Sequence, residues 1–313
     1  TGWQSGAAYG SRIDNRAANA YFKIAVPVGA GVYDPDAKSE RRSSLAAVVD
    51  YDHFGEHAYF GLNTYGGNEN DVTASVMLNS YFDLHSSLMV GVQTRLAHYG
   101  EDVVNSTPWQ HSAPAAQLGR DEREAGAYAE YTYDLKDRLT AVAGLRADYN
   151  GLHRRWLVTP RAHVKWAITP TTALRASAGL GYRTANVIAD NIGMLTTGRR
   201  IVVGGADATS EAFGQINTLE RSLTAGASLT QRFRLGPDPG ASISLDYFRT
   251  RFYNSVIVDQ EWSADVINIY STRGRATTDN VQLDFNWTPV QRFDVLATFR
   301  YTASRMTLNR PDG

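Results

Sequence analysis

The chain has 313 residues, with 31 basic and 32 acidic side chains, a formal net charge of −1 and no cysteine. The charge balance argues against nucleic acid as a partner, because phosphate binding needs a basic excess. The lack of cysteine excludes disulfides, thiolate nucleophiles and cysteine-ligated metals. No stretch approaches about 18 apolar residues, so no transmembrane helix is predicted, and the first residues do not resemble a cleavable signal.

Apolar and polar residues alternate with a period of two along most of the chain. This period is typical of β-strands, because adjacent strand side chains point to opposite faces. In the run from Glu124 to Leu135, one parity holds alanine, tyrosine and leucine, and the other is mostly polar. About twelve strands are predicted, in chain order, at residues 17–28, 43–53, 72–83, 88–98, 123–134, 138–149, 158–168, 172–182, 221–234, 241–252, 273–287 and 291–303.

The predicted strands are long enough to cross a bilayer. About 11 residues at ~3.3 Å each, tilted by about 45°, rise roughly 26 Å, which matches the apolar band of an outer-membrane barrel. Short turns are predicted at 83–87, 135–137, 169–171, 236–240 and 289–290. Long connections are predicted at 99–122, 183–220 and 253–272. Short turns at one end and long loops at the other are typical of transmembrane barrels.

The two faces of the predicted strands differ in polarity. On the apolar face, aliphatic residues lie between two aromatic girdles, as lipid–water interfaces select. The girdle residues are Phe82, Tyr133, Trp166, Phe233, Trp287 and Phe293 beside the short turns, and Tyr51, Tyr149, Tyr182, Tyr247 and Tyr301 at the far ends. The other face carries many ions that a dry core could not hold without a severe desolvation cost. We therefore expect Ala143 and Ala176 to face lipid, and Arg146 and Arg175 to face an aqueous lumen.

Several motifs then occur in order along these strands. They are Pro160–Trp166, Leu174–Gly179, Gly181–Asn186, Ala189–Gly193, Asp246–Thr250 and Val256–Asp259. With this order and these turns, the chain resembles the TonB-dependent outer-membrane receptors, especially the siderophore/colicin-receptor-like group of Bacteroidetes-type bacteria. The resemblance covers most of the chain and is densest from 124 to 303. One departure is the strand entry at 220–226, where Glu220 and Gly226 remain but the usual tryptophan and asparagine are replaced.

The resemblance implies an all-β, transmembrane antiparallel β-barrel of 22 strands, closed by an N-terminal plug. Residues 1–313 are then expected to be part of a single barrel domain, with the plug and the final strands absent from this chain. It also implies the outer membrane of a Gram-negative bacterium, contact with its lipid, and coupling through the plug to the TonB complex. The implied activity is active transport of an iron–siderophore or a related metal chelate.

Two groups of basic residues are candidates to face the ligand or the plug. Lumen-facing candidates are predicted on the strands, where cations suit plug carboxylates or an anionic ligand; they are Arg146, Arg161, His163, Lys165 and Arg175. The longest predicted loop adds Arg183, Arg199 and Arg200, which are candidates to recognise an anionic ligand at the outer mouth.

One short segment has the composition, but not the spacing, of a metal cluster. Asp50, Asp52, His53, Glu56 and His57 are close in sequence, but histidines four apart converge only on a helix. This segment is predicted instead as a strand end followed by a polar loop. No metal, no cofactor and no enzyme activity are predicted, because no ordered nucleophilic or acid–base set is found. The alternatives left open are the same fold importing cobalamin, haem or an oligosaccharide, and a passive porin-like barrel without a plug.

Overall fold

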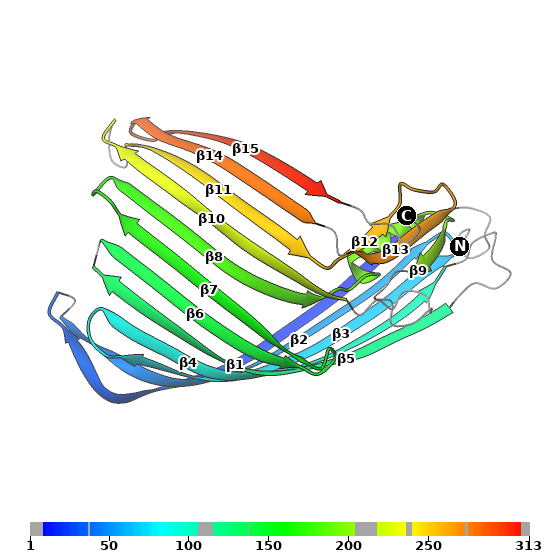
Figure 1. Ribbon diagram of the computed structural model, residues 1–313, viewed down its shortest axis with the longest axis horizontal. Coiled ribbons are helices and arrows are strands. Elements are labelled where there is room, and N and C mark those ends of the chain that lie inside the picture. The colour runs from blue at the N-terminus through cyan, green and yellow to red at the C-terminus, as the bar shows by residue number, and fades with distance from the viewer. Residues whose placement is uncertain are drawn as a thin grey trace.

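The computed structural model describes residues 9–36, 38–105, 115–136, 138–203, 218–235, 240–272 and 275–307. Its main feature is a 12-stranded sheet in which each strand pairs with its neighbours along the chain (Figure 1). The strands are β1 (Ser11–Asp34), β2 (Ser39–Phe60), β3 (Asn63–Tyr81), β4 (Ser86–Val104), β5 (Ala115–Leu135), β6 (Leu139–Asn150), β7 (Arg155–Ala167), β8 (Thr172–Thr184), β10 (Leu219–Phe233), β11 (Ala241–Tyr253), β14 (Ala276–Val290) and β15 (Phe293–Met306).

Smaller elements lie in two of the connections. The connection after β8 holds the 3-10 helix η1 (Ala189–Thr196) and β9 (Arg200–Val203), and the connection after β11 holds β12 (Ser255–Asp259) and β13 (Val266–Thr272). These short strands form a separate three-stranded sheet in the order β12-β13-β9. Figure 1 shows the large sheet curled into an open trough, with the small sheet at its long-loop end.

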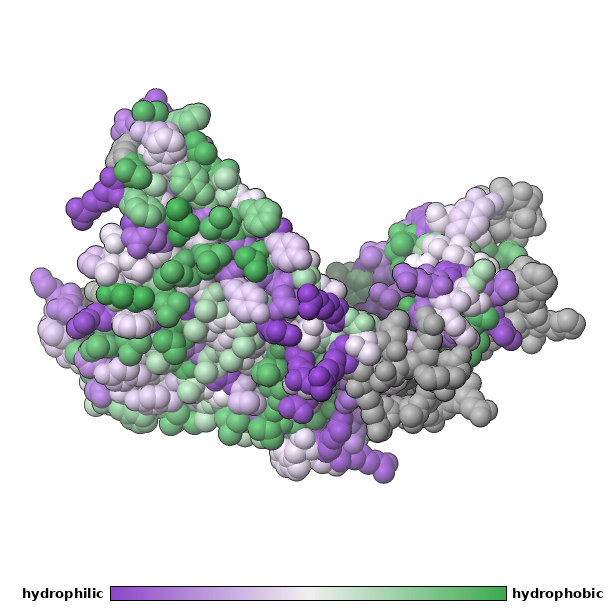
Figure 2. Space-filling view, turned by 45° about the horizontal axis from the view of Figure 1, so that its top comes forward, coloured by the Kyte–Doolittle hydropathy of each residue, from purple (hydrophilic) through white to green (hydrophobic). Residues whose placement is uncertain are grey.

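All twelve predicted strands are present, and the antiparallel register confirms the predicted faces. Cα-paired residues share a face of a sheet. Ala143 pairs with Tyr131 on one side and with Ala162 on the other, which forms an outward row. Lys165 pairs with Arg175 in an inward row. The outward face exposes many large apolar side chains, including Val49, Leu145, Val164, Trp166, Leu229 and Leu245. Figure 2 shows them as a broad green surface over the strands.

The predicted strand ends are wrong at the long-loop end. The stretch 99–122 is predicted as a loop, but β4 continues to Val104 and β5 begins at Ala115. The period of two persists on the inward face, at Tyr99, Glu101 and Val103. The outward residues beyond the girdle are no longer apolar, because they lie outside the lipid layer. The alternation of apolar and polar residues that predicts a strand is therefore weaker there.

The first strands also extend past the predicted polar loop near residue 55. His53 and His57 lie inside β2, so the loop predicted for them is wrong. His53 contacts the Asn70 side chain at 2.9 Å across the ladder to β3. The β2–β3 connection is then only Gly61 and Leu62, with Gly61 at φ +62°, a conformation that glycine adopts without strain.

The long connections nevertheless all lie at one end, although the short β2–β3 and β6–β7 connections lie there too. Those after β4, β8 and β11 share one end of the sheet, whereas compact turns at 82–85, 168–171 and 291–292 lie at the other. The turn predicted at 289–290 falls inside β14, and Arg292 makes the turn with φ +67°. The predicted turn at 236–240 lies mostly outside the described residues.

The main apolar core lies at the long-loop end. Beyond the girdle, the inner wall carries large apolar side chains among its charged ones: Phe60, Tyr65, Val103 and Leu118 are all buried. They belong to one cluster with buried residues of the two long connections, namely Ala185, Val187, Ile188, Met194, Leu195, Ile201, Ile267 and Ile269. We call residues 185–203 and 255–272 the loop cap. It was not predicted, and it covers the inside of the wall at this end.

Candidate functional site

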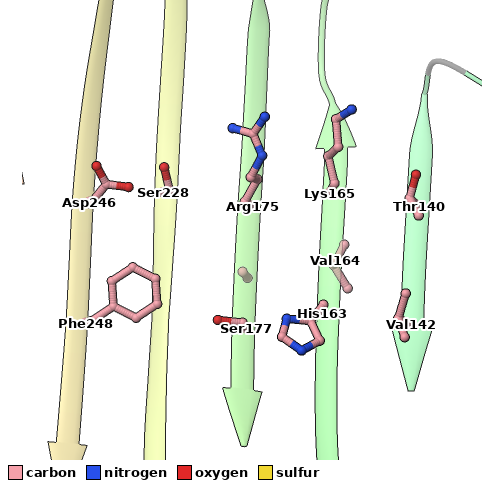
Figure 3. Close-up of a pocket in the computed structure, with 11 residues that line it drawn as sticks. Thr140, Val142, His163, Val164, Lys165, Arg175, Ser177, Ser228, Asp246 and Phe248 are labelled. Atoms are coloured by element: carbon pink, nitrogen blue, oxygen red, sulfur yellow. The ribbon is translucent and has the colours of Figure 1, made fainter. Parts of the chain in front are cut away.

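Three of the predicted site residues meet on the inner face beside the short turns. His163 and Lys165 on β7 and Arg175 on β8 line a cavity of about 370 Å³ (Figure 3). The compact turn at 168–171 brings these strands together, because the Thr169 hydroxyl accepts hydrogen bonds from the backbone N–H groups of Thr171 and Thr172 at 3.2 and 2.9 Å. We call His163, Lys165 and Arg175 the cationic row.

The row continues across the next two strands. Arg175 pairs with Ser228 on β10, and Ser228 pairs with Asp246 on β11. Figure 3 shows Lys165, Arg175, Ser228 and Asp246 at one level of the trough, with His163 at the next. Asp246 thus supplies negative charge to the same cavity.

Lys165 and Arg175 place two like charges directly opposite each other, which destabilises a sheet unless the charges are compensated. Among the described residues, neither takes part in any of the ion pairs found within 4.0 Å. Both side chains are exposed to the trough. The cationic row therefore presents net positive charge to the inner space, because Asp246 offsets only one of the two cations and forms no ion pair with either. A carboxylate or another anionic oxygen would bind favourably there.

The other two lumen-facing candidates are already engaged by the wall. Arg146 donates to Asp148 at 2.6 Å and to Gln93 at 2.7 Å. Arg161 donates through Nε to Glu130 at 2.8 Å. Both side chains face inward as predicted, but each guanidinium reaches across one intervening strand, from β6 to Gln93 on β4 and from β7 to Glu130 on β5.

The three arginines predicted in the longest loop lie apart from the cationic row, at the long-loop end, and the loop position predicted for Arg183 is wrong because Arg183 lies inside β8. Arg183 donates to Glu220 at 2.6 Å and pairs with Asp190 at 3.3 Å. Arg199 donates to the Gln260 carbonyl at 2.6 Å and so ties together the two segments of the loop cap. Arg200 is exposed on β9, where its backbone N–H donates to the Asp265 carbonyl at 2.9 Å.

A second cavity, of about 270 Å³, lies between the wall and η1. Arg120 stacks 3.9 Å from the Tyr99 ring, bonds Glu122 at 2.7 Å and donates to the Asn186 side chain of the cap. On the same wall, the Tyr65 hydroxyl donates to Glu101 at 2.9 Å. Tyr99, Glu101, Arg120 and Glu122 were missed because 99–122 was predicted as a loop, and Tyr65 was missed because the predicted strand began only at residue 72. The alternation at 99, 101 and 103 was the available signal.

Burial controls the ionisation of this second cavity. Desolvation raises the pKa of Glu101 above its ordinary value, and the hydrogen bond from Tyr65 opposes that rise. The same desolvation raises the pKa of Tyr65. The half-buried carboxylate is therefore costly at neutral pH, because its charged form has lost part of its water.

Replacing Glu101 by glutamine is expected to stabilise the cap against the wall at neutral pH. The raised pKa means that the folded state holds a proton that the unfolded state has lost. Stability therefore falls as the pH rises from about 4.3 through the raised folded-state pKa. Glutamine keeps an acceptor for Tyr65 without this charge. The melting temperature of full-length Glu101→Gln, measured in detergent from mildly acidic to neutral pH, should exceed that of wild type only at the upper end.

Asp121 is the matched control, because its pKa is shifted in the opposite direction. Its hydrogen bond with His98 lowers the pKa of this exposed carboxyl, so its ionised form is the favoured one. Asp121→Asn should therefore give no gain at neutral pH. Equal gains in both variants would mean that general charge reduction, not burial of Glu101, is responsible.

The fold and the inner face together define a class of protein. An antiparallel meander with an apolar exterior, a charged interior and its longest loops at one end is the wall of an outer-membrane β-barrel. Among the described residues, no helix is long and apolar enough to cross a bilayer. The family described as TonB dependent receptor-like, beta-barrel matches residues 2–313, and the chain belongs to this family. It is a protein of the outer membrane of Gram-negative bacteria.

Solved structures show the same fold at low identity. The pyoverdine outer membrane receptor FpvA from Pseudomonas aeruginosa PAO1 has a TM-score of 0.61 and 11% identity, covering 96% of this chain and 46% of that one. BauA, the ferric preacinetobactin receptor from Acinetobacter baumannii, has a TM-score of 0.58 and 9% identity, covering 96% and 47%. The alcaligin receptor FauA from Bordetella pertussis has a TM-score of 0.54 and 14% identity, covering 96% and 48%.

The chain therefore spans slightly less than half the length of these three structures. A search of curated proteins finds no match to it. The likeness to the solved structures concerns the fold alone.

Proposed function

We propose that the full-length protein is a TonB-dependent active-transport receptor for an iron–siderophore or a related metal chelate. Membership of the family supports the transport class, and the structural neighbours include receptors for pyoverdine, preacinetobactin and alcaligin. The observation that carries the proposal is the inner wall: a charged, exposed surface that requires water or a polar occupant. We also propose that the protein is of the Bacteroidetes-type subgroup of these receptors and that its plug is a segment outside this chain.

The cationic row has a specific role in this proposal. Lys165 and Arg175 lie beside the short turns, at the end opposite the long loops, so an external ligand would meet them last. We propose that they hold carboxylates of the plug, with an anionic ligand in transit as the second occupant. Arg200, which is exposed on the loop cap, is placed to meet an anionic ligand at the outer mouth.

Uptake measurements with and without a proton-motive force test the function. Cells that depend on the full-length protein should take up a radiolabelled ferric siderophore, and a protonophore should abolish that uptake. Hydroxamate and catecholate siderophores, cobalamin, haem and a maltooligosaccharide form the panel of cargoes. Energised uptake of only a non-siderophore would reassign the cargo, and uptake that persists with the protonophore would favour a passive porin-like barrel.

A double variant in the same assay tests the cationic row. Lys165→Glu with Arg175→Glu should lower energised uptake and cause a several-fold rise in entry of a small hydrophilic dye, because attraction to plug carboxylates becomes repulsion. Arg138→Glu with Arg292→Glu is the matched control, since both arginines are exposed in short turns at the same end. An unchanged dye leak in the first variant would remove the plug role and leave the receptor function standing.

A further inference from the structure

Arginines gather on the outward face just beyond the apolar band. Arg221 on β10, Arg251 on β11 and Arg305 on β15 all have the parity of the lipid-facing residues, and we call them the outer arginine cluster. Arg251 and Arg305 both pair with Thr277 of β14, one on each side. Strands lie about 4.8 Å apart, so the two backbones are separated by roughly 10 Å. Figure 2 shows hydrophilic residues gathered where the green surface borders the long-loop end.

Aromatic rings hold two members of the cluster. The Arg221 guanidinium carbon lies 5.8 Å from the centre of the Tyr182 ring and 5.1 Å from that of Tyr253. The Arg251 guanidinium carbon lies 4.8 Å from the Tyr253 ring. Stacking on an aromatic face orders a guanidinium while leaving its N–H groups free to bind an anion.

The negative charge on this part of the outer face is smaller than the positive charge. Asp279 shares the face, but it lies 3.7 Å from Arg249 and accepts a hydrogen bond from Tyr247 at 2.8 Å. Among the described residues, no ion pair within 4.0 Å involves the outer arginine cluster. Among the residues that the structure describes, the three cations therefore have no carboxylate partner within 4.0 Å.

The depth of the cluster matches the headgroup layer. On β11 and β15 the girdle tyrosines are Tyr247 and Tyr301, and Arg251 and Arg305 each follow four residues later on the same face. Four strand residues tilted by about 45° rise roughly 9 Å. The polar zone on each side of a bilayer is about 5–8 Å thick. The Arg251 and Arg305 backbones thus lie at the outer edge of this layer, and their long side chains can reach back to the lipid phosphates.

From this depth, the outward direction and the missing carboxylates, we propose that the outer arginine cluster binds the anionic phosphate headgroup of an outer-leaflet lipid. Arginine forks bind phosphate oxygens in pairs, and basic residues at a membrane surface attract anionic lipids additively. The site is on the exterior of the wall and is independent of the inner cavity and of any transported cargo.

A lipid titration of the full-length protein tests this site. The protein is purified in neutral detergent, and its melting temperature is followed as phosphatidic acid is added to the micelles. Wild type should be stabilised by phosphatidic acid, and less so at high salt, but not by phosphatidylcholine or by inorganic phosphate alone. The triple variant R221Q/R251Q/R305Q should bind phosphatidic acid roughly 100-fold more weakly, at about fivefold per arginine.

Two further variants keep the test falsifiable. R138Q/R234Q/R292Q removes three exposed arginines from the short-turn end and should respond like wild type. R221K/R251K/R305K keeps the charge and should regain part of the affinity, which separates binding from a folding defect. An unchanged response in the glutamine triple variant, or an equal loss in the control, would overturn the proposal. A full response to inorganic phosphate alone would replace the lipid by a free anion.

Discussion

Arginine at position 143 is expected to cost the full-length protein about 2–4 kcal/mol of folding free energy in a bilayer, the penalty for a lipid-facing cation near the midplane. Ala143 lies at the middle of β6, faces outward and sits in a row with Tyr131 and Ala162. The guanidinium would lose its water in the hydrocarbon layer. The urea midpoint for unfolding from lipid vesicles should fall, and the heat-resistant folded band on gels should weaken.

The adjacent residue is the matched control. Val142 lines the inner cavity, on the opposite face of the same strand. Val142→Arg should therefore leave insertion into vesicles nearly intact, although it adds the same side chain one position away. If Ala143→Arg folds as well as wild type, or if the two costs are equal, the assignment of the two faces is wrong.

Truncation of Leu195 to alanine is expected to cost about 2–5 kcal/mol of the free energy that docks the loop cap on the wall. Leu195 has no exposed side-chain surface, and its carbonyl accepts a hydrogen bond from Asn63 of the wall at 2.7 Å. Alanine would leave a cavity between the two. Hydrogen exchange of backbone amides in 185–203 and 255–272 should then accelerate by a factor of thirty or more, since about 1.4 kcal/mol corresponds to a tenfold change.

Hydrogen exchange in the strands of the large sheet should change little in Leu195→Ala, because each strand is held by backbone hydrogen bonds to its neighbouring strands. Leu62→Ala is the control, since Leu62 is an exposed leucine in the β2–β3 turn at the same end of the molecule. Equal acceleration in both variants, or acceleration spread through β6–β8, would show that the cap is not a separate cooperative unit.

Local alternation was enough to predict the wall. Each strand pairs with its neighbours in sequence, and its two faces meet different surroundings. The period of two therefore predicts both where the strands lie and which residues face each side. The pairing of Lys165 with Arg175, which was not predicted from the sequence, is explained by the compact turn between the two strands, which fixes their register. The predicted faces of Ala143 and Arg175 are confirmed.

The loop cap could not be predicted in the same way. Ile188, Leu195 and Ile267 stand in short apolar runs without a period, and their burial depends on wall residues such as Phe60 and Leu118 that are distant in sequence. The engagement of Arg183 by Glu220 and of Arg199 by Gln260 likewise depends on how the long connections return to the sheet. The proposed binding roles of these arginines remain predictions.

The apolar cluster between the inner wall and the loop cap has a kinetic consequence. Pairing of neighbouring strands in the wall joins residues that are close in sequence. The apolar cluster that holds the loop cap instead joins β2, β3, β4 and β5 to segments far along the chain. Closing such long loops is slow, because the entropy is lost before the contacts form. The strands are therefore expected to pair first and the loop cap to dock last. During folding, the barrel wall then passes through an intermediate in which the loop cap does not yet cover the outer mouth.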